Sequence, residues 1–225
     1  NVDFSELDKI FNVLIDGFHG NEFFLYAQLS RNAKFRSHSY DDGAESNLLV
    51  VITPIETKRY DTILELTTCE DIRYELCNVK TINLIPSVIA SKKASREGCD
   101  EAIFHRGDIV TECAHSNLFI MKDGILITHP ADNHILPGIT RQRFIELAKE
   151  NSIKTVEAKF TVKDLLNSDS IIITSTTKLA KRGILKNSAV FSHSDDEIPL
   201  LLCKAFEEDY LNSTVLNTYS PRKKS

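Results

Sequence analysis

Apolar residues recur along the chain with two different periods, and each period predicts a type of element. Near the N-terminus they recur every three or four residues as far as Gly17, which predicts an amphipathic helix. Pro86 in a first-turn position and Gly98 at the far end predict a second helix over residues 85–98. The helical period returns over residues 139–150 and 198–211, so four helices are expected.

Short aliphatic and β-branched runs between turn residues predict strands. We expect them at residues 23–29, 48–53, 62–68, 101–105, 109–111, 117–121, 125–128 and 170–174. Asp123-Gly124 separates two of these runs, and this dipeptide is typical of a two-residue hairpin turn. Hairpins together with segregated helices indicate an α+β protein or a mixed sheet, not a regular βαβ series.

A polar stretch and a proline divide the chain. Residues 31–47 are rich in Ser, Asp and basic residues, which predicts a loop. Pro54-Ile55-Glu56-Thr57 follows a strand and is a candidate linker. We therefore expect a small N-terminal α/β domain over residues 1–53, a linker over 54–57 and a larger domain over 58–225.

Composition narrows the class of protein. The 225 residues carry a net charge of −5, with 42% hydrophobic and 26% charged residues. These values are typical of a globular protein and leave no basic surface for nucleic acid. No apolar run approaches a membrane span, and the first residues do not resemble a signal peptide. The chain does not begin with Met, so its true start is expected to precede Asn1.

Cysteine and histidine usage indicates neither a disulfide framework nor a metal site. Five cysteines without CxxC pairs fit a reducing cytoplasm. The spacing of the histidines does not match a metal-ligand pattern, so no metal is expected. The histidines considered are His105, His115, His129 and His134.

Two residues could carry covalent and acid–base chemistry. Lys80 lies between apolar residues just before a helix; it is either a surface lysine or a Schiff-base amine in a partly desolvated pocket. Glu112 precedes small polar residues and a strand. It is either an ordinary turn residue or a buried carboxylate that pairs with a pyridinium nitrogen.

Other segments could bind anions. Gly138-Ile139-Thr140 begins a helix, where free N–H groups favour phosphate, and Ser175-Thr176-Thr177 follows a strand and offers hydroxyls. Both segments are also common as simple caps and turns. Arg36 and His38 are two residues apart and could clamp a carboxylate, or lie in a solvated loop. A basic run reads as a solvated face: Lys178, Lys181, Arg182 and Lys186.

The order of these segments resembles one family. It is similar to the class IV (fold type IV) pyridoxal-phosphate enzymes, and within them to the D-amino-acid aminotransferases. The resemblance is carried, in chain order, by Glu70-Asp71-Ile72-Arg73, Val79-Lys80-Thr81-Ile82-Asn83-Leu84, Glu101-Ala102-Ile103-Phe104-His105-Arg106, Val110-Thr111-Glu112, Ser116-Asn117-Leu118-Phe119, Lys122-Asp123-Gly124-Ile125-Leu126, Ile135-Leu136-Pro137-Gly138-Ile139-Thr140-Arg141 and Thr174-Ser175-Thr176-Thr177. It implies a two-domain α+β fold with a barrel-like mixed sheet, and pyridoxal 5′-phosphate as cofactor.

The resemblance also assigns roles. Lys80 would form the Schiff base and shuttle the substrate proton, Glu112 would pair with the pyridine nitrogen, and Leu136 would pack on the ring. The phosphate would be held by four further residues, namely Ile139, Thr140, Ser175 and Thr176. Family members carry an N-terminal stretch that supplies an Arg to the phosphate; no residues here match it, so the chain resembles a truncated member.

The substrate side of the resemblance points to D-amino acids. Gln28-Leu29-Ser30-Arg31 followed by Arg36-Ser37-His38 matches the family pattern that reaches the substrate carboxylate from the partner subunit. The resemblance therefore implies a homodimer that transaminates a D-alanine or D-glutamate type of substrate with a 2-oxo acid acceptor.

The segment Cys113-Ala114-His115 departs from the aminotransferase pattern and is similar to aminodeoxychorismate lyase. A pyruvate-releasing lyase and a non-catalytic remnant of the family remain the alternatives.

Overall fold

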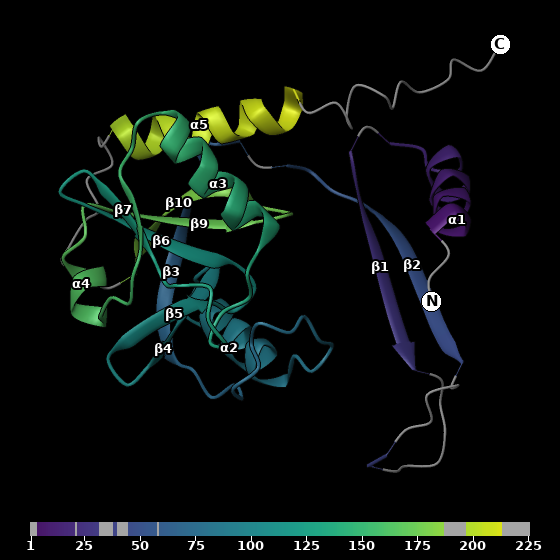
Figure 1. Ribbon diagram of the computed structural model, residues 1–225, viewed down its shortest axis with the longest axis horizontal. Helices are drawn as coiled ribbons and strands as arrows, with labels where there is room; N and C mark the ends of the chain where they lie inside the picture. Colours follow the sequence, from purple (N-terminus) through teal and green to yellow (C-terminus); the bar gives the residue numbers. More distant parts are fainter. Residues whose placement is uncertain are drawn as a thin grey trace. The chain divides into compact units, whose positions relative to one another are not determined.

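The first of two compact units contains one helix and one hairpin. The computed structural model describes residues 4–20, 22–31, 38–39, 45–57, 59–186 and 197–212, and the units are Asn1–Thr57 and Lys58–Ser225. In the first unit α1 (Phe4–Asp16) precedes β1 (Phe23–Arg31) and β2 (Ser46–Pro54). The two strands pair in antiparallel register along their whole length (Figure 1).

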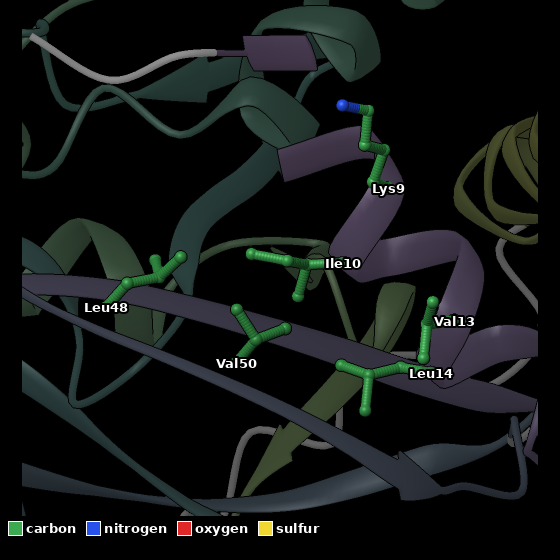
Figure 2. A pocket seen from close by; sticks show the side chains of 6 residues that line it. All are labelled: Lys9, Ile10, Val13, Leu14, Leu48 and Val50. Atoms are coloured by element: carbon green, nitrogen blue, oxygen red, sulfur yellow. The ribbon is translucent and has the colours of Figure 1, made fainter. Parts of the chain in front are cut away.

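The helix and hairpin of this unit leave an apolar hollow between them. Figure 2 shows side chains of α1 and β2 around a cavity of about 410 Å³. It is lined by Lys9, Ile10, Val13, Leu14, Leu48 and Val50. The apolar face of the first unit is therefore only partly covered by its own described residues.

The second unit is built on an eight-stranded mixed sheet. Its spatial order is β5-β4-β3-β10-β9-β6-β7-β8, with parallel pairing of β3 to β4 and β10 and of β7 to β8. The strands are β3 (Ile63–Glu70), β4 (Glu101–Arg106), β5 (Ile109–Cys113), β6 (Asn117–Lys122), β7 (Ile125–Thr128), β8 (Thr155–Glu157), β9 (Ser170–Ser175) and β10 (Leu179–Leu185). Four helices accompany them: α2 (Ile85–Arg96), α3 (Ile139–Glu150), α4 (Val162–Leu166) and α5 (Glu197–Asn212).

The sheet curls until its two edges approach each other. Ile109 of β5 forms a bridge with Thr161, in the segment that follows the opposite edge strand β8. The backbone N–H of Val110 donates to the carbonyl of Phe160 at 3.0 Å, so the contact is a hydrogen-bonded one. This confirms the α+β fold with a barrel-like mixed sheet.

Alternation along the strands builds two cores. Leu118 and Ile120 of β6 pack inside the curled sheet, whereas Phe119 and Met121 point outward to α3 and α5, as a period of two requires. A third buried cluster joins α2 to β4, with Ala90 and Ala94 from the helix and Ala102 and Phe104 from the strand. Figure 1 shows the helix beside this strand. Every one of the strands that the sequence predicts is present, with boundaries shifted by a few residues.

The hairpin between β6 and β7 also forms as predicted. Lys122 pairs with Ile125 across a two-residue loop, and Asp123 and Gly124 have φ of 50° and 72°. Both values lie in the left-handed region that this turn requires, where glycine is at no steric disadvantage.

The basic run after Thr177 is not the solvated face that its composition suggests. Leu179–Leu185 is strand β10, which lies between β3 and β9 inside the sheet. Lys181 is only 1% exposed, and Lys178 donates to the buried carboxylate of Glu101 at 2.5 Å. Of the four basic residues only Lys186 is exposed, and its side chain is 37% exposed.

Two further observations concern the whole described chain. All five cysteines are free thiols. Among the residues that the structure describes, no helix has both the length and the apolar character needed to cross a membrane.

Candidate active site

Glu112 is the buried acid around which the candidate site is organised. It lies near the end of β5 and is 5% exposed. Its Oε1 accepts from Arg73 Nη1 at 2.6 Å, and its Oε2 accepts from Asn117 Nδ2 at 3.0 Å and from the N–H of Leu136 at 3.1 Å. A carboxylate offers about four lone-pair positions, so three donors leave one position on Oε1.

Arg73 is held rigidly behind this carboxylate. Asp71, whose side chain is fully buried, accepts from Arg73 Nε and Nη2, both at 2.9 Å. The guanidinium also lies 4.6 Å above the ring centroid of Phe104. Thr111 and Arg106 donate to the same aspartate. This bidentate pair fixes the position from which Arg73 reaches Glu112.

Burial decides the pKa of Glu112, whereas the hydrogen bonds and charge of Arg73 decide the pKa of Asp71. Burial raises the pKa of Glu112 to about 7, against the lowering effect of Arg73 and of the Leu136 N–H. Burial alone would also raise the pKa of Asp71, but the hydrogen bonds and charge of Arg73 outweigh it and the pKa lies below its ordinary value. Near neutral pH, Glu112 is thus poised between forms and Asp71 is ionised.

Asn117 joins the acid to the start of α3. Its Nδ2 donates both to Glu112 and, at 2.8 Å, to the carbonyl of Leu136. A side chain at Gly138 would collide with the amide oxygen of Asn117. Glycine is therefore needed here for close approach and not for its backbone freedom.

The start of α3 has the uncapped backbone N–H groups that an anion would need. Gly138 is the N-cap residue in an extended conformation, and no side chain caps the helix. Ile139, the first helical residue, is 88% exposed. Uncapped N–H groups of Ile139 and Thr140, together with the helix dipole, favour a phosphate.

A buried hydroxyl without a partner lies on the strand that pairs with β6 at Asn117. Thr174 of β9 is the register partner of Asn117 in β6, and its Oγ1 has no hydrogen bond within the described part of the chain. Ser175 and Thr176 follow directly; Ser175 accepts from the N–H of Lys178 at 3.2 Å, and Thr176 is exposed. An orphaned buried hydroxyl is costly unless a ligand or water satisfies it.

Lys80 lies in the segment between β3 and α2. It is exposed, and within the described residues its amine makes no hydrogen bond or ion pair. The segment is tied to the loop after β7 by the N–H of Cys77, which donates to the carbonyl of Asn133 at 2.9 Å. The partly desolvated pocket expected for this lysine is therefore not formed by the chain's own described residues.

The two residues expected to contact substrate lie in the first unit. His38 is described and exposed, whereas Arg36 lies outside the described residues. Their roles remain predictions.

The segment Cys113-Ala114-His115 is fixed by a second buried acid. Glu101 is fully buried and accepts from the N–H of His115 at 3.0 Å and from Ser116 Oγ at 2.9 Å. Lys178 supplies the balancing charge. The departure in sequence at residues 113–115 and the lysine after Thr177 thus belong to one cluster.

Four residues that organise this site lie in segments that carry the resemblance, but sequence reasoning gave them no role: Asp71, Arg73, Asn117 and Thr174. A usable signal existed for the first two, because an acid and an arginine two residues apart lie within five residues of the end of a predicted strand. Asn117 and Thr174 carried no such signal, since their importance comes from pairing between strands far apart in sequence.

The chain is similar to known proteins in both sequence and fold. The model of the amino-transferase class IV family matches residues 1–183. A D-alanine aminotransferase of Listeria monocytogenes is 51% identical over 110 residues, which are 49% of this chain and 38% of that protein. The matched segment thus covers less than half the length of this curated relative.

Solved structures support the same fold. One is a crystal structure titled as a putative 4-amino-4-deoxychorismate lyase of Legionella pneumophila, with a TM-score of 0.78 and 22% identity over 93% of this chain and 78% of that one. Another is an aminotransferase of Brucella abortus bound to pyridoxal phosphate, with a TM-score of 0.78 and 18% identity over 95% of this chain and 77% of that one. At these identities the likeness concerns the fold alone.

Proposed function

The chain belongs to the class IV aminotransferases, which are pyridoxal-phosphate-dependent, and from that premise we propose that it transaminates a small D-amino acid with a 2-oxo acid acceptor. Lys80 is the proposed attachment point for the cofactor. When bound, the cofactor supplies an electron sink for the charge that develops at the substrate Cα.

The observation that carries the proposal is the free acceptor position on Glu112. Three donors hold the carboxylate, and the remaining position on Oε1 suits a protonated ring nitrogen. Arg73 favours the ionised carboxylate, and a second cationic N–H would favour it further. Glu112 can thus keep a proton on the pyridine nitrogen, which is what the electron sink needs.

The other end of the cofactor would meet the start of α3. The uncapped N–H groups of Ile139 and Thr140 suit the phosphate, and Ser175 and Thr176 contribute from the end of β9. Asn117 contacts Glu112 and closely approaches Gly138, so one side chain sets the separation of the two binding positions. Leu136 is partly buried, and its backbone contacts both Glu112 and Asn117.

Lys80 would act twice. Its amine would first hold the cofactor, and, once displaced by the amino donor, would take the proton from the substrate Cα and return it at C4′. A lysine suited to this task needs partial desolvation, which lowers its pKa. The exposure of Lys80 in the single chain indicates that another surface completes its pocket.

We propose that a second copy of this chain supplies that surface. Large apolar side chains around Lys80 are 44% to 69% exposed, and such a patch is costly in a monomer. They are Ile72, Tyr74, Leu76, Val79, Ile82, Leu84, Ile85, Val88 and Ile89. A homodimer would cover them, and it would allow Arg36 and His38 of one subunit to reach the substrate carboxylate in the other.

A spectral titration of the cofactor-loaded protein tests the function. D-alanine should change the visible absorption of the bound cofactor, and 2-oxoglutarate should restore it, whereas L-alanine should do neither. Preference for L-leucine over D-alanine would instead indicate a branched-chain L-aminotransferase.

A pyruvate-releasing lyase is the second candidate. The turn at Cys113-Ala114-His115 favours it, because Glu101 and Lys178 hold this departure from the aminotransferase pattern in place. Pyruvate released from aminodeoxychorismate without an amino acceptor would support the lyase, whereas strict dependence on an oxo acid would support transamination.

A further inference from the structure

Three potential metal ligands converge in the loop between β7 and α3. They are His129, Asp132 and His134, and their ligand atoms all lie within 4.8 Å of one another. His129 Nε2 is 3.3 Å and His134 Nδ1 is 3.5 Å from Asp132 Oδ2. The spacing of these histidines in sequence predicted no metal site, and only the turn of this loop brings them together.

Hydrogen bonds fix which nitrogen of each ring carries the proton. His129 is 1% exposed, and its Nδ1 lies 2.8 Å from the carbonyl of Val110. A carbonyl only accepts, so Nδ1 carries a hydrogen, and in the neutral ring Nε2, which lies 3.3 Å from Asp132 Oδ2, keeps its lone pair. His134 Nε2 likewise lies 3.0 Å from the carboxylate of Glu75, which leaves the lone pair on Nδ1.

In their neutral forms the two rings therefore turn lone pairs toward one carboxylate oxygen. The backbone N–H of His134 donates to Asp132 Oδ1 at 2.9 Å, which restricts rotation of the carboxylate. In those forms three acceptor atoms face one another, and either a bound cation or a proton on a ring nitrogen would relieve their repulsion. Lys159 lies 3.8 Å from Asp132 Oδ2, but its side chain is 53% exposed and it is a competitor at the edge of the cluster.

The two separations between a histidine nitrogen and Asp132 Oδ2 match those around a small divalent ion. Two ligands at about 2.0–2.1 Å from zinc, at a tetrahedral angle, lie about 3.3 Å apart. Two imidazole nitrogens with one carboxylate oxygen is a donor set that zinc accepts, with the fourth position open. The carbonyl of Val110 and the carboxylate of Glu75 are the outer partners that orient such histidines.

We propose that His129, Asp132 and His134 bind a divalent transition-metal ion of the zinc type. The site would tie Glu75, in the segment that leads to Lys80, to the loop that contributes Leu136 to the Glu112 site. The metal would thereby hold the two segments together without contacting Glu112.

Cobalt(II) titration of the untagged, chelator-treated protein tests the site. Co²⁺ should bind in a 1:1 ratio with the visible absorption of a tetrahedral ion, and Zn²⁺ should displace it and raise the thermal unfolding midpoint. His134→Gln and Asp132→Asn should each weaken binding at least tenfold. Circular dichroism checks that the variants are folded.

His105→Gln is the matched control. His105 also pairs with an exposed glutamate, and its side chain is 22% exposed against 25% for His134, but it lies outside the cluster. This variant should bind Co²⁺ as the original chain does. Absence of binding, equal binding by the His134 and Asp132 variants, or a sulfur-to-cobalt charge-transfer band that assigns the ion to cysteines would each overturn the proposal. None of these readouts depends on transamination.

Discussion

The two halves of the proposed active site differ sharply in how complete they are. Around Glu112 each charged group has an opposite charge or a donor within hydrogen-bonding distance, and the acids are buried. Around Lys80 the amine is exposed and large apolar side chains face outward. The difference suggests that one chain builds the electrostatic half by itself, whereas the lysine half needs a bound cofactor and a second surface.

The largest expected effect comes from removing the amine. Lys80→Ala should lower kcat by about 10³-fold or more, because nucleophile and proton carrier are lost together. The visible absorption of the bound cofactor should shift or disappear. Stability in urea should change by less than about 0.5 kcal/mol, since an exposed side chain without partners is removed. An unchanged spectrum would remove Lys80 from the proposal.

Glu112→Gln tests the electrostatic half. We expect kcat to fall by roughly 10²-fold, because a neutral amide cannot hold the ring nitrogen protonated. His105→Gln, outside the site, is the control and should retain activity. Retention of full activity by the Glu112 variant would contradict the role of the acid.

In cofactor-free protein, the stability of the Glu112→Gln variant relative to the original chain should depend on pH. Burial raises the pKa of Glu112 from 4.5 to about 7. The neutral carboxyl of Glu112 therefore makes its full contribution to the stability of the folded state below pH 4.5, and this contribution is lost as the pH rises through about 7. Glutamine stays neutral, so the variant should gain stability relative to the original chain above pH 7, by up to roughly 3 kcal/mol. Urea unfolding at pH 5 and pH 8 measures the difference.

Asp71→Asn should weaken the support of Arg73. Removal of one partner from a buried ion pair costs about 3 kcal/mol. The pKa of Asp71 lies below its ordinary 3.8, so its contribution is present above that pH and is lost as the pH falls through the folded-state pKa. The variant and the original chain should converge in urea unfolding at low pH. A constant difference at all pH values would argue against the ion pair.

The smallest effect is expected in the exposed half of the site, around Lys80. Ile89→Glu places a charge in the apolar patch of α2 and should weaken a homodimer about tenfold or more. Analytical ultracentrifugation would detect the change. Leu201→Glu on α5 is the control, since Leu201 is 58% exposed against 57% for Ile89. If both variants sediment like the original chain, the patch is not the dimer contact.

Sequence reasoning succeeded where a local pattern sufficed. Apolar periodicity located α3 and β6, and Asp123-Gly124 located the turn between β6 and β7. These signals depend only on residues close together in sequence. It missed β8, α4 and β10. Lys181 and Arg182 made β10 look solvated, but the strand lies between β3 and β9, where Lys181 is buried.

The candidate site divides along the same line. Motif order was enough to select Lys80, Glu112 and the start of α3. It could not show that Arg73 reaches Glu112 across 39 positions of sequence, or that Lys178 neutralises Glu101 across 77. Such contacts depend on strand register, which no local pattern specifies.

By itself the sequence determined the family, the alternation that separates the two cores, and the residue types available for chemistry. Only the tertiary structure decided which charges are buried together, that Lys80 stays exposed in a single chain, and that His129, Asp132 and His134 converge. The reason is physical: hydrophobic periodicity is set within a few residues, whereas the pKa of an acid and the geometry of a site depend on groups that folding brings within about 4 Å.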